Sequence, residues 1–133
     1  MSTLKVNTIQ NTSGSHGSTP EEIAKGRAKA YVNCAGGSGS SSGGGISINS
    51  SFNVTSVTDQ GVGRCRITFS DTMTNSNLCA VFGFSRSDSN MIVYNDADDA
   101  KAATHIDVRT TFSWSSGGNA GDVGQLYVAI FGD

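Results

Sequence analysis

Leucine, glutamate and lysine, three of the residues that most favour helices, are scarce in this sequence. Glycine is abundant instead, with 17 of the 133 residues, and serine, threonine and asparagine fill much of the remainder. Such a composition favours short strands joined by many turns. The length suits one domain that can bury its own core without cross-links.

The chain also lacks a strong charge of either sign and a long apolar run. Lys+Arg number 9 against Asp+Glu 11, for a net charge of −2, which leaves no basic face for electrostatic binding of nucleic acid. A membrane-spanning helix needs about 20 apolar residues in succession, and no segment offers them. The first residues lack the apolar stretch of a secretion signal, so we expect synthesis and retention in a cytoplasm.

Cysteine and histidine are too few and too scattered to suggest a metal centre. Cys34, Cys65 and Cys79 form an odd set without a CxxC spacing, so we expect small buried thiols, with a disulfide as the alternative. His16 and His105 are the only imidazoles. We favour solvated surface positions for both over a metal held on a symmetry axis.

The patterns that would indicate an enzyme are weak. Residues 39–43 (GSSSG) match the Gly-x-Ser-x-Gly hydrolase motif, but they lie in a Gly/Ser run instead of a strand–turn–helix. Asp98, Asp99 and Asp107 could supply a glycosidase pair, although such pairs usually belong to longer chains with elongated grooves. We therefore predict no catalytic activity, no cofactor and no resident metal.

An acidic cluster at residues 95–99 (NDADD) has two interpretations. Alternating oxygen ligands could bind Ca²⁺, yet the later glycine and the distant glutamate of a calcium loop are missing, which favours a charged turn. Polar loops at one end of a β domain can also contact a glycan. The candidate receptor-contacting residues are Arg86, Asp88, Asn90, Asn95, Asp96, Asp98 and Asp99.

Alternating apolar residues predict the strands of the main domain. In residues 64–69 the inward positions are Cys65, Ile67 and Phe69, and residues 105–114 alternate in the same way. In residues 105–114 the predicted inward side chains are Ile106, Val108, Thr110, Phe112 and Trp114, so that Trp114 lies in the core. The predicted solvent-facing side chains are His105, Asp107, Arg109 and Thr111.

Further signals complete the predicted domain. We expect two short strands that begin near Ile46 and Phe52, broken at Asn49–Ser50, and a turn at Asp59–Gly63. The pattern as a whole predicts an all-β fold over residues 31–133: an antiparallel β-sandwich or jelly-roll-like domain.

Two segments, 78–84 and 126–131, are apolar on both of their faces. A strand of that kind needs cover on both sides, and the core of a small sandwich covers only the inner one. We therefore expect the outer side chains Tyr127, Ala129 and Phe131 to meet another subunit in a homo-oligomer.

The region before the β domain divides into two parts. Residues 1–17 contain an alternating segment, with Leu4, Val6 and Ile9, followed by a polar linker and no hairpin partner. An isolated strand is unstable in water, so it must pair at a distance or with another chain. For residues 18–30 we expect a short helix that begins with the capping signals Thr19, Pro20 and Glu22. Its apolar side chains are few and small: Ile23, Ala24 and Ala28.

Three stretches carry a resemblance to a known family: residues 2–10 (STLKVNTIQ), 17–33 (GSTPEEIAKGRAKAYVN) and 51–61 (SFNVTSVTDQG). They resemble the tail-fibre-like proteins of marine tailed phages, notably those that infect cyanobacteria. The resemblance covers roughly the first half of the chain and implies a virion protein without enzymatic activity. It implies an N-terminal docking segment, with Leu4, Val6 and Ile9 at docking positions, and a trimer seam along residues 18–30.

On this basis we expect a subunit of a short tail fibre or a similar appendage that is made in the host cytoplasm and projects a β domain toward the host surface. Its partners would be two further copies and other virion proteins. The sequence has no shaft repeats between anchor and tip. A connector, a capsid-decorating or head-fibre protein, and a glycan-binding tip module therefore remain open alternatives.

Overall fold

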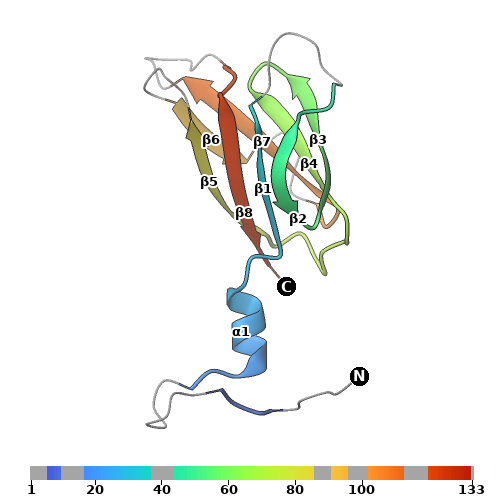
Figure 1. Cartoon of the computed structure of the whole chain (residues 1–133), viewed down its shortest axis with the longest axis vertical. Helices are drawn as coiled ribbons and strands as arrows, with labels where there is room; N and C mark the ends of the chain where they lie inside the picture. Colours follow the sequence, from blue (N-terminus) through green and yellow to red (C-terminus); the bar gives the residue numbers. More distant parts are fainter. Residues whose placement is uncertain are drawn as a thin grey trace.

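The protein is described by a computed structural model that covers residues 6–9, 17–36, 44–85, 91–95, 102–112 and 120–132. One short helix, α1 (Pro20–Gly26), precedes a series of β-strands (Figure 1). The strands are β1 (Ala30–Ala35), β2 (Ile48–Phe52), β3 (Val54–Gly61), β4 (Arg64–Phe69), β5 (Cys79–Ser85), β6 (Met91–Asn95), β7 (His105–Phe112) and β8 (Gln125–Phe131).

The strands form two four-stranded antiparallel sheets, in the orders β2-β1-β8-β5 and β3-β4-β7-β6. The chain crosses from one sheet to the other after β2, β4, β5 and β7. Two layers packed face to face make a β-sandwich, which confirms the predicted all-β class. Strand β8, the last in sequence, lies between β1 and β5, so the sheet depends on pairings between the two ends of the domain.

The core lies between the sheets and follows the predicted alternation. The inward residues Cys65, Ile67 and Phe69 of β4 are buried, as the sequence predicted. They face a second layer from β1 and β8, in which the buried side chains are Ala30, Val32, Cys34, Leu126, Val128 and Ile130. Burial of these apolar side chains between the two sheets is the main source of folding free energy, at about 25 cal/mol per Å² of apolar surface removed from water.

The joint between the sheets differs from the sequence-based prediction. The break expected at Asn49–Ser50 lies instead at Asn53, which has a positive φ of 53°. Asparagine tolerates this left-handed conformation better than most residues. Its Nδ2 donates to the carbonyls of Lys29 and Asp71, at 3.1 and 3.3 Å, and its Oδ1 accepts from the Asp71 amide at 2.6 Å. Tertiary bonds thus fix where the chain leaves the first sheet.

The predicted turn at Asp59–Gly63 is shorter than expected, because β3 continues through Gly61. The turn proper is Val62–Gly63, where Gly63 has a φ of 68°. A Cβ at Gly63 would lie 2.4 Å from the Thr110 carbonyl oxygen, so only glycine fits between the turn and β7.

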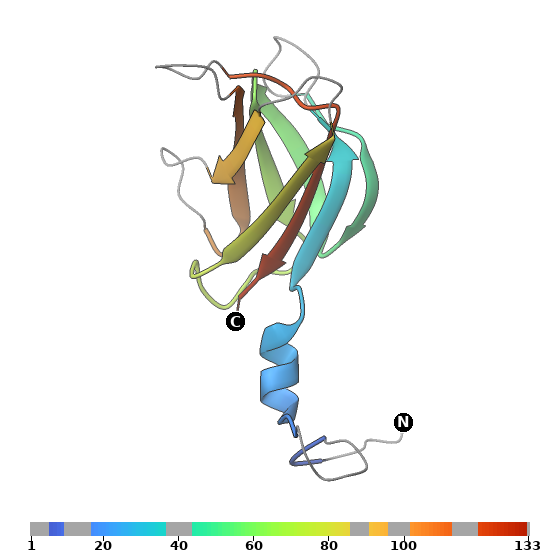
Figure 2. The same ribbon diagram turned by 90° about the vertical axis from the view of Figure 1, so that its left-hand side faces the viewer.

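Helix α1 lies beyond one end of the sandwich, in line with β1, in both Figure 1 and Figure 2. The Lys29 amide donates to the Ile130 carbonyl at 2.7 Å, which ties the chain after the helix to β8. Before the helix, Ile9 and Ser18 exchange two backbone hydrogen bonds of 2.8 Å each. Within the described residues, no helix has both the length and the apolar character needed to span a membrane.

Candidate functional site

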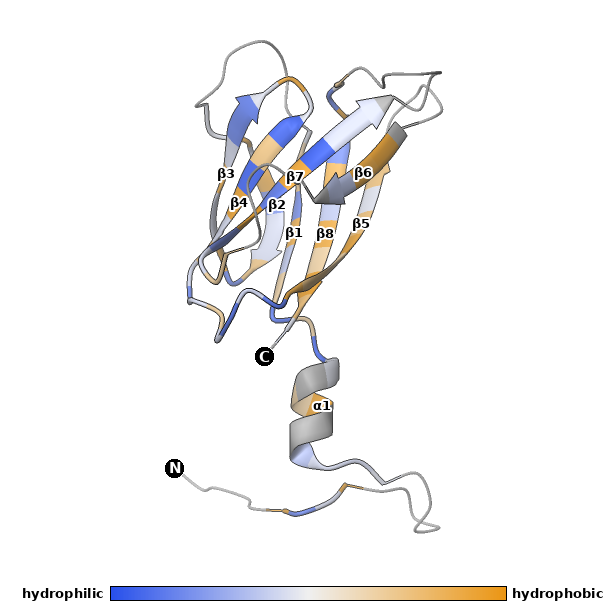
Figure 3. Cartoon of the chain, turned by 180° about the vertical axis from the view of Figure 1, so that it is seen from behind, coloured by the Kyte–Doolittle hydropathy of each residue, from blue (hydrophilic) through white to orange (hydrophobic). Residues whose placement is uncertain are grey.

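The outer surface of the β2-β1-β8-β5 sheet is apolar. Cross-strand register places Phe52, Tyr31, Ala129 and Val81 in one row across all four strands. We call this outer surface the apolar face and define it by six residues: Tyr31, Phe52, Val81, Tyr127, Ala129 and Phe131. Strand β5 is hydrophobic over most of its length in Figure 3.

Several of these side chains are open to solvent. Val81 is 57% exposed and Phe52 is 56% exposed, which are large fractions for apolar residues in regular strands. The rings of Tyr31 and Phe52 stack, with centroids 6.3 Å apart and an interplanar angle of 23°. A contiguous exposed surface of this kind usually marks an interaction site.

Tyr127 occupies the next row of the apolar face. A Cβ on Gly83 would lie 3.6 Å from the Tyr127 Cβ and 3.7 Å from its Cδ2, so the tyrosine lies against the glycine backbone of β5. The Tyr127 hydroxyl donates to the Gln125 side chain. A neighbouring polar pair, Asn49 Nδ2 and Asn33 Oδ1 at 3.3 Å, borders the apolar residues.

Cys79 also lies on this outer surface, opposite Phe131 on β8. It is exposed, whereas the sequence predicted three buried thiols, so that prediction is wrong for Cys79. The physical reason is the strand's alternation: Leu78 and Ala80 point into the core, and the residue between them must point outward.

The outer surface of the opposite sheet carries charged residues on its central strands β4 and β7, while the edge strand β6 exposes Ile92 and Tyr94. Arg66 on β4 pairs across the strands with Asp107 on β7, and two hydrogen bonds of 2.8 and 2.7 Å join the guanidinium to the carboxylate. We call the five residues Arg64, Arg66, His105, Asp107 and Arg109 the charged face. The sequence assigned Asp107 to a solvent surface, yet it is 5% exposed, because the Arg66 side chain covers it.

His105 lies at the margin of the charged face. Its Nδ1 is 3.0 Å from the Thr104 hydroxyl, and its Nε2 is 4.0 Å from the nearer Asp107 oxygen. Among the residues that the structure describes, no group of three or more His, Cys, Asp and Glu side chains converges on a point where a metal could bind.

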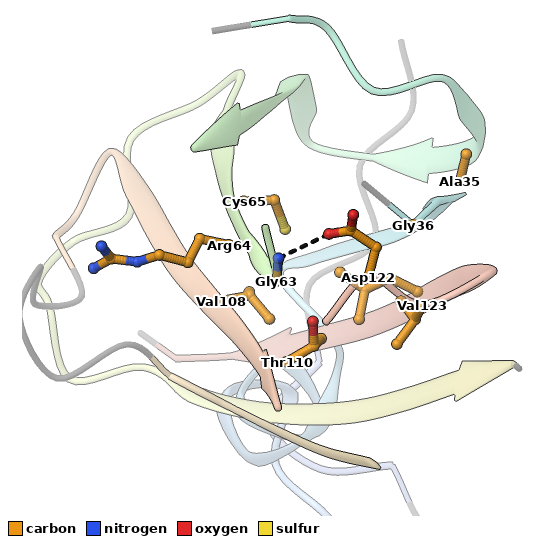
Figure 4. A pocket seen from close by; sticks show the side chains of 10 residues that line it. Ala35, Gly36, Gly63, Arg64, Cys65, Val108, Thr110, Asp122 and Val123 are labelled. Carbon is orange, nitrogen blue, oxygen red and sulfur yellow. Dashed lines mark hydrogen bonds between the residues drawn. The ribbon is translucent and has the colours of Figure 1, made fainter. Parts of the chain in front are cut away.

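A small pocket opens between the sheets at the end of the sandwich remote from α1 (Figure 4). Asp122 closes it by accepting a hydrogen bond of 2.7 Å from the Gly63 amide. Its volume is about 10 Å³, which has room for a single water and not for a substrate. The pocket therefore belongs to the packing of the sandwich end.

The two inward cysteines are poorly suited to nucleophilic chemistry. Burial raises the pKa of the Cys34 thiol to about 11. Burial also raises the pKa of Cys65, and the neighbouring Cys34 and the carboxylates of Asp107, Asp59 and Asp122 add to the effect. The reactive form of cysteine is the thiolate, so both side chains stay protonated and inert near neutral pH.

The N-terminal candidates lie apart from the sandwich. Val6 is 39% exposed and Ile9 is 54% exposed, and Leu4 lies outside the described residues. On α1, Ile23 is 38% exposed, while Ala24 and the following Ala28 are half-buried. The chain thus presents apolar side chains at its arm and on its helix.

Most of the predicted receptor-contacting residues lie outside the residues that the structure describes. Asn95 ends β6, and the others lie outside the described ranges: Arg86, Asp88, Asn90, Asp96, Asp98 and Asp99. Trp114, His16 and the 39–43 motif lie outside them too. Sequence reasoning missed Tyr31 and Phe52, because only the strand order shows that they lie beside Ala129, whereas Val81 lies in the predicted segment 78–84.

Comparison with protein families, curated proteins and solved structures finds no match to this chain.

Proposed function

We propose that this chain is a non-enzymatic structural subunit of a phage virion, of the short tail-fibre or appendage type. In this proposal its N-terminal arm docks to the particle, and three copies assemble through α1 and their jelly-roll-like sandwiches. The observation that carries it is the pairing of an exposed apolar arm, at Val6 and Ile9, with a sandwich whose apolar face lies open. The resemblance of residues 2–10 and 17–33 to phage tail-fibre-like proteins supplies the context.

Energetics support an assembled state. Helix α1 spans 7 residues, and isolated helices shorter than about 12 residues are marginal in water. Ile23 on α1 is 38% exposed in the single chain. Copies of α1 packed against one another would bury this side chain, and the half-buried Ala24 is small enough to let helices approach closely. The half-buried Ala28 follows the helix and would lie near the same contact. Tyr127, Ala129 and Phe131 would be covered in the same assembly.

The docking role can be tested by placing negative charges on the N-terminal arm. Val6→Asp combined with Ile9→Asp should leave the sandwich folded, because neither side chain contributes to its core. The same double substitution should abolish incorporation into phage particles when the variant replaces the natural protein during infection. Val62→Asp is the matched control, since Val62 is 43% exposed in a turn of the sandwich.

Equal incorporation of the double variant and the control would overturn the docking role. Electron microscopy of particles with the protein labelled gives the position directly. Label at the tail supports the fibre assignment, and label over the capsid would replace it with a decoration or head-fibre role. Light scattering at micromolar concentration should give the mass of a trimer.

A further inference from the structure

The short connection between α1 and β1 restricts where the sandwich can lie relative to packed α1 helices. Between the end of α1 at Gly26 and the start of β1 at Ala30 lie four Cα–Cα steps. At 3.8 Å each they reach at most roughly 15 Å. If copies of α1 pack around an axis, the start of β1 must therefore lie near that axis. The opposite sheet lies about 10 Å from the β1 sheet, across the core.

Only one surface of the β1 sheet is free to face the axis. Its inner surface is filled by the core, in which Ala30, Val32 and Cys34 are buried. Its outer surface is the apolar face. Connectivity thus brings β1 close to the axis, and the exposure of Phe52, Tyr31 and Val81 selects the outer surface of its sheet for the contact.

We infer that the apolar face packs against further copies of this chain, arranged in parallel with the α1 helices, and that the row Phe52, Tyr31, Ala129 and Val81 forms the contact. The inference rests on the proposed function, because it takes the packing of α1 as its starting point. It assigns the charged face, with Arg64, Arg66 and Arg109, to the outside of the assembly.

The size of the apolar face fits a shared contact. Four strands about 4.8 Å apart, each of some seven residues rising 3.4 Å, give a flat area of roughly 400 Å² per copy. A stable interface buries about 800 Å² per partner. The sheet surface alone falls short of this value, so the seam along α1 must contribute the remainder.

A matched pair of substitutions tests the inference in the full-length chain. Val81→Arg places a charge on the apolar face, and Ile92→Arg places the same charge on β6 in the opposite sheet, where Ile92 is 50% exposed. Both should keep the far-UV circular dichroism spectrum of the natural protein, which shows that the sandwich is folded. In sedimentation velocity, Val81→Arg should raise the dissociation constant of the oligomer more than tenfold, and Ile92→Arg should leave it unchanged.

The outcomes separate the two proposals. A natural protein that is monomeric at micromolar concentration would overturn the proposed function and the inference together. An oligomeric natural protein that Val81→Arg does not weaken would overturn only the inference. Equal weakening by both arginines would also overturn it, because the effect would then not be specific to the apolar face.

Cys79 provides a chemical readout of the same comparison. It is exposed in the single chain beside Phe131, while Cys34 and Cys65 are buried in the core and should stay unreactive in either state. We expect maleimide labelling of Cys79 to be at least tenfold slower in the natural oligomer than in the Val81→Arg variant. Labelling of Cys79 at equal rates in the two proteins would contradict burial of the apolar face.

Discussion

The two sheets of this sandwich share one core, but their outer surfaces are built from different residue types. On the β2-β1-β8-β5 sheet, the register aligns Phe52, Tyr31, Ala129 and Val81. On the β3-β4-β7-β6 sheet, the register opposes Arg66 to Asp107 and Arg64 to Arg109. On the charged face, the Arg66 guanidinium and the Asp107 carboxylate are hydrogen-bonded to each other within the single chain. On the apolar face, Val81 and Phe52 stay more than half exposed even though Phe52 stacks on Tyr31, so a partner would be needed to remove them from water.

The two outer surfaces are expected to affect different free energies: that of unfolding the single chain and that of association between copies. Hydrogen-bonded charges on the second sheet act within the single chain, so their loss should lower the free energy of unfolding. Exposed apolar residues on the first sheet contribute little to the fold, since surface substitutions usually change stability by less than about 0.5 kcal/mol. Their contribution should become measurable when copies associate.

The largest effect is expected from the core that both sheets share. Ile67→Ala in the second sheet and Ile130→Ala in the first should each lower the free energy of unfolding by about 3 kcal/mol, because both side chains are fully buried. Urea denaturation measures this value. Ile92→Ala, at an exposed position, is the control and should stay within about 0.5 kcal/mol. A much smaller loss at one isoleucine than at the other would show that the sheets do not share the core equally.

The next effect concerns the charged face. Asp107→Ala should cost about 2 kcal/mol, a value reduced from that of a fully buried pair because the Arg66 side chain is 32% exposed. A double-mutant cycle with Arg66→Ala isolates the interaction between the two side chains. A coupling energy near zero would mean that the pair is only a surface contact.

The third effect is a dependence on alkaline pH. The folded Cys34 thiol has its pKa raised to about 11, from 9.0 in the unfolded chain, so both states hold the proton below pH 9. Between pH 9 and 11 the unfolded chain loses this proton first, and stability therefore falls as pH rises. We expect a loss of the order of 2 kcal/mol.

Urea midpoints from pH 8 to 11 measure the alkaline slope. Cys34→Ala should reduce the slope, and the buried Cys65, whose pKa is also raised, should supply the remainder. Cys79→Ala, which changes the exposed thiol opposite Phe131, should keep the slope of the natural protein. Identical slopes in all three proteins would assign the alkaline loss to other groups.

The smallest effect concerns the joint between the two sheets. Asn53→Ala loses three hydrogen bonds and places alanine at a φ of 53°, so we expect a cost of about 1–2 kcal/mol. Asn53→Gly removes the same bonds but accepts the backbone conformation, so it should cost less. Thermal melting distinguishes them, and equal melting temperatures would show that the left-handed backbone adds no strain to the alanine variant.

Much of the secondary structure could be predicted, because alternation is a local signal. Residues 64–69 show in sequence which side chains enter the core, and the structure buries Cys65, Ile67 and Phe69 accordingly. The break at Asn53 could not be predicted in the same way. It depends on bonds to Lys29 and Asp71, which are distant in sequence. Burial of Asp107 likewise depends on a guanidinium from another strand.

The candidate site was predictable only in part. The sequence indicated Tyr127, Ala129 and Phe131, since their segment is apolar on both faces. It did not indicate Tyr31 or Phe52, whose own segments are not apolar on both faces. Nor did it distinguish Cys79 from the two buried thiols, because a short run that is apolar throughout does not fix which residue faces outward.

By itself, then, the sequence determined the β class of this protein and the inward set of several strands, since side-chain direction in a strand follows from a period of two along the chain. Tertiary structure alone decided the strand order, and with it the gathering of residues 31, 52, 81 and 129 into one row. Pairing between strands depends on contacts across about a hundred residues of chain, and no local pattern encodes such contacts.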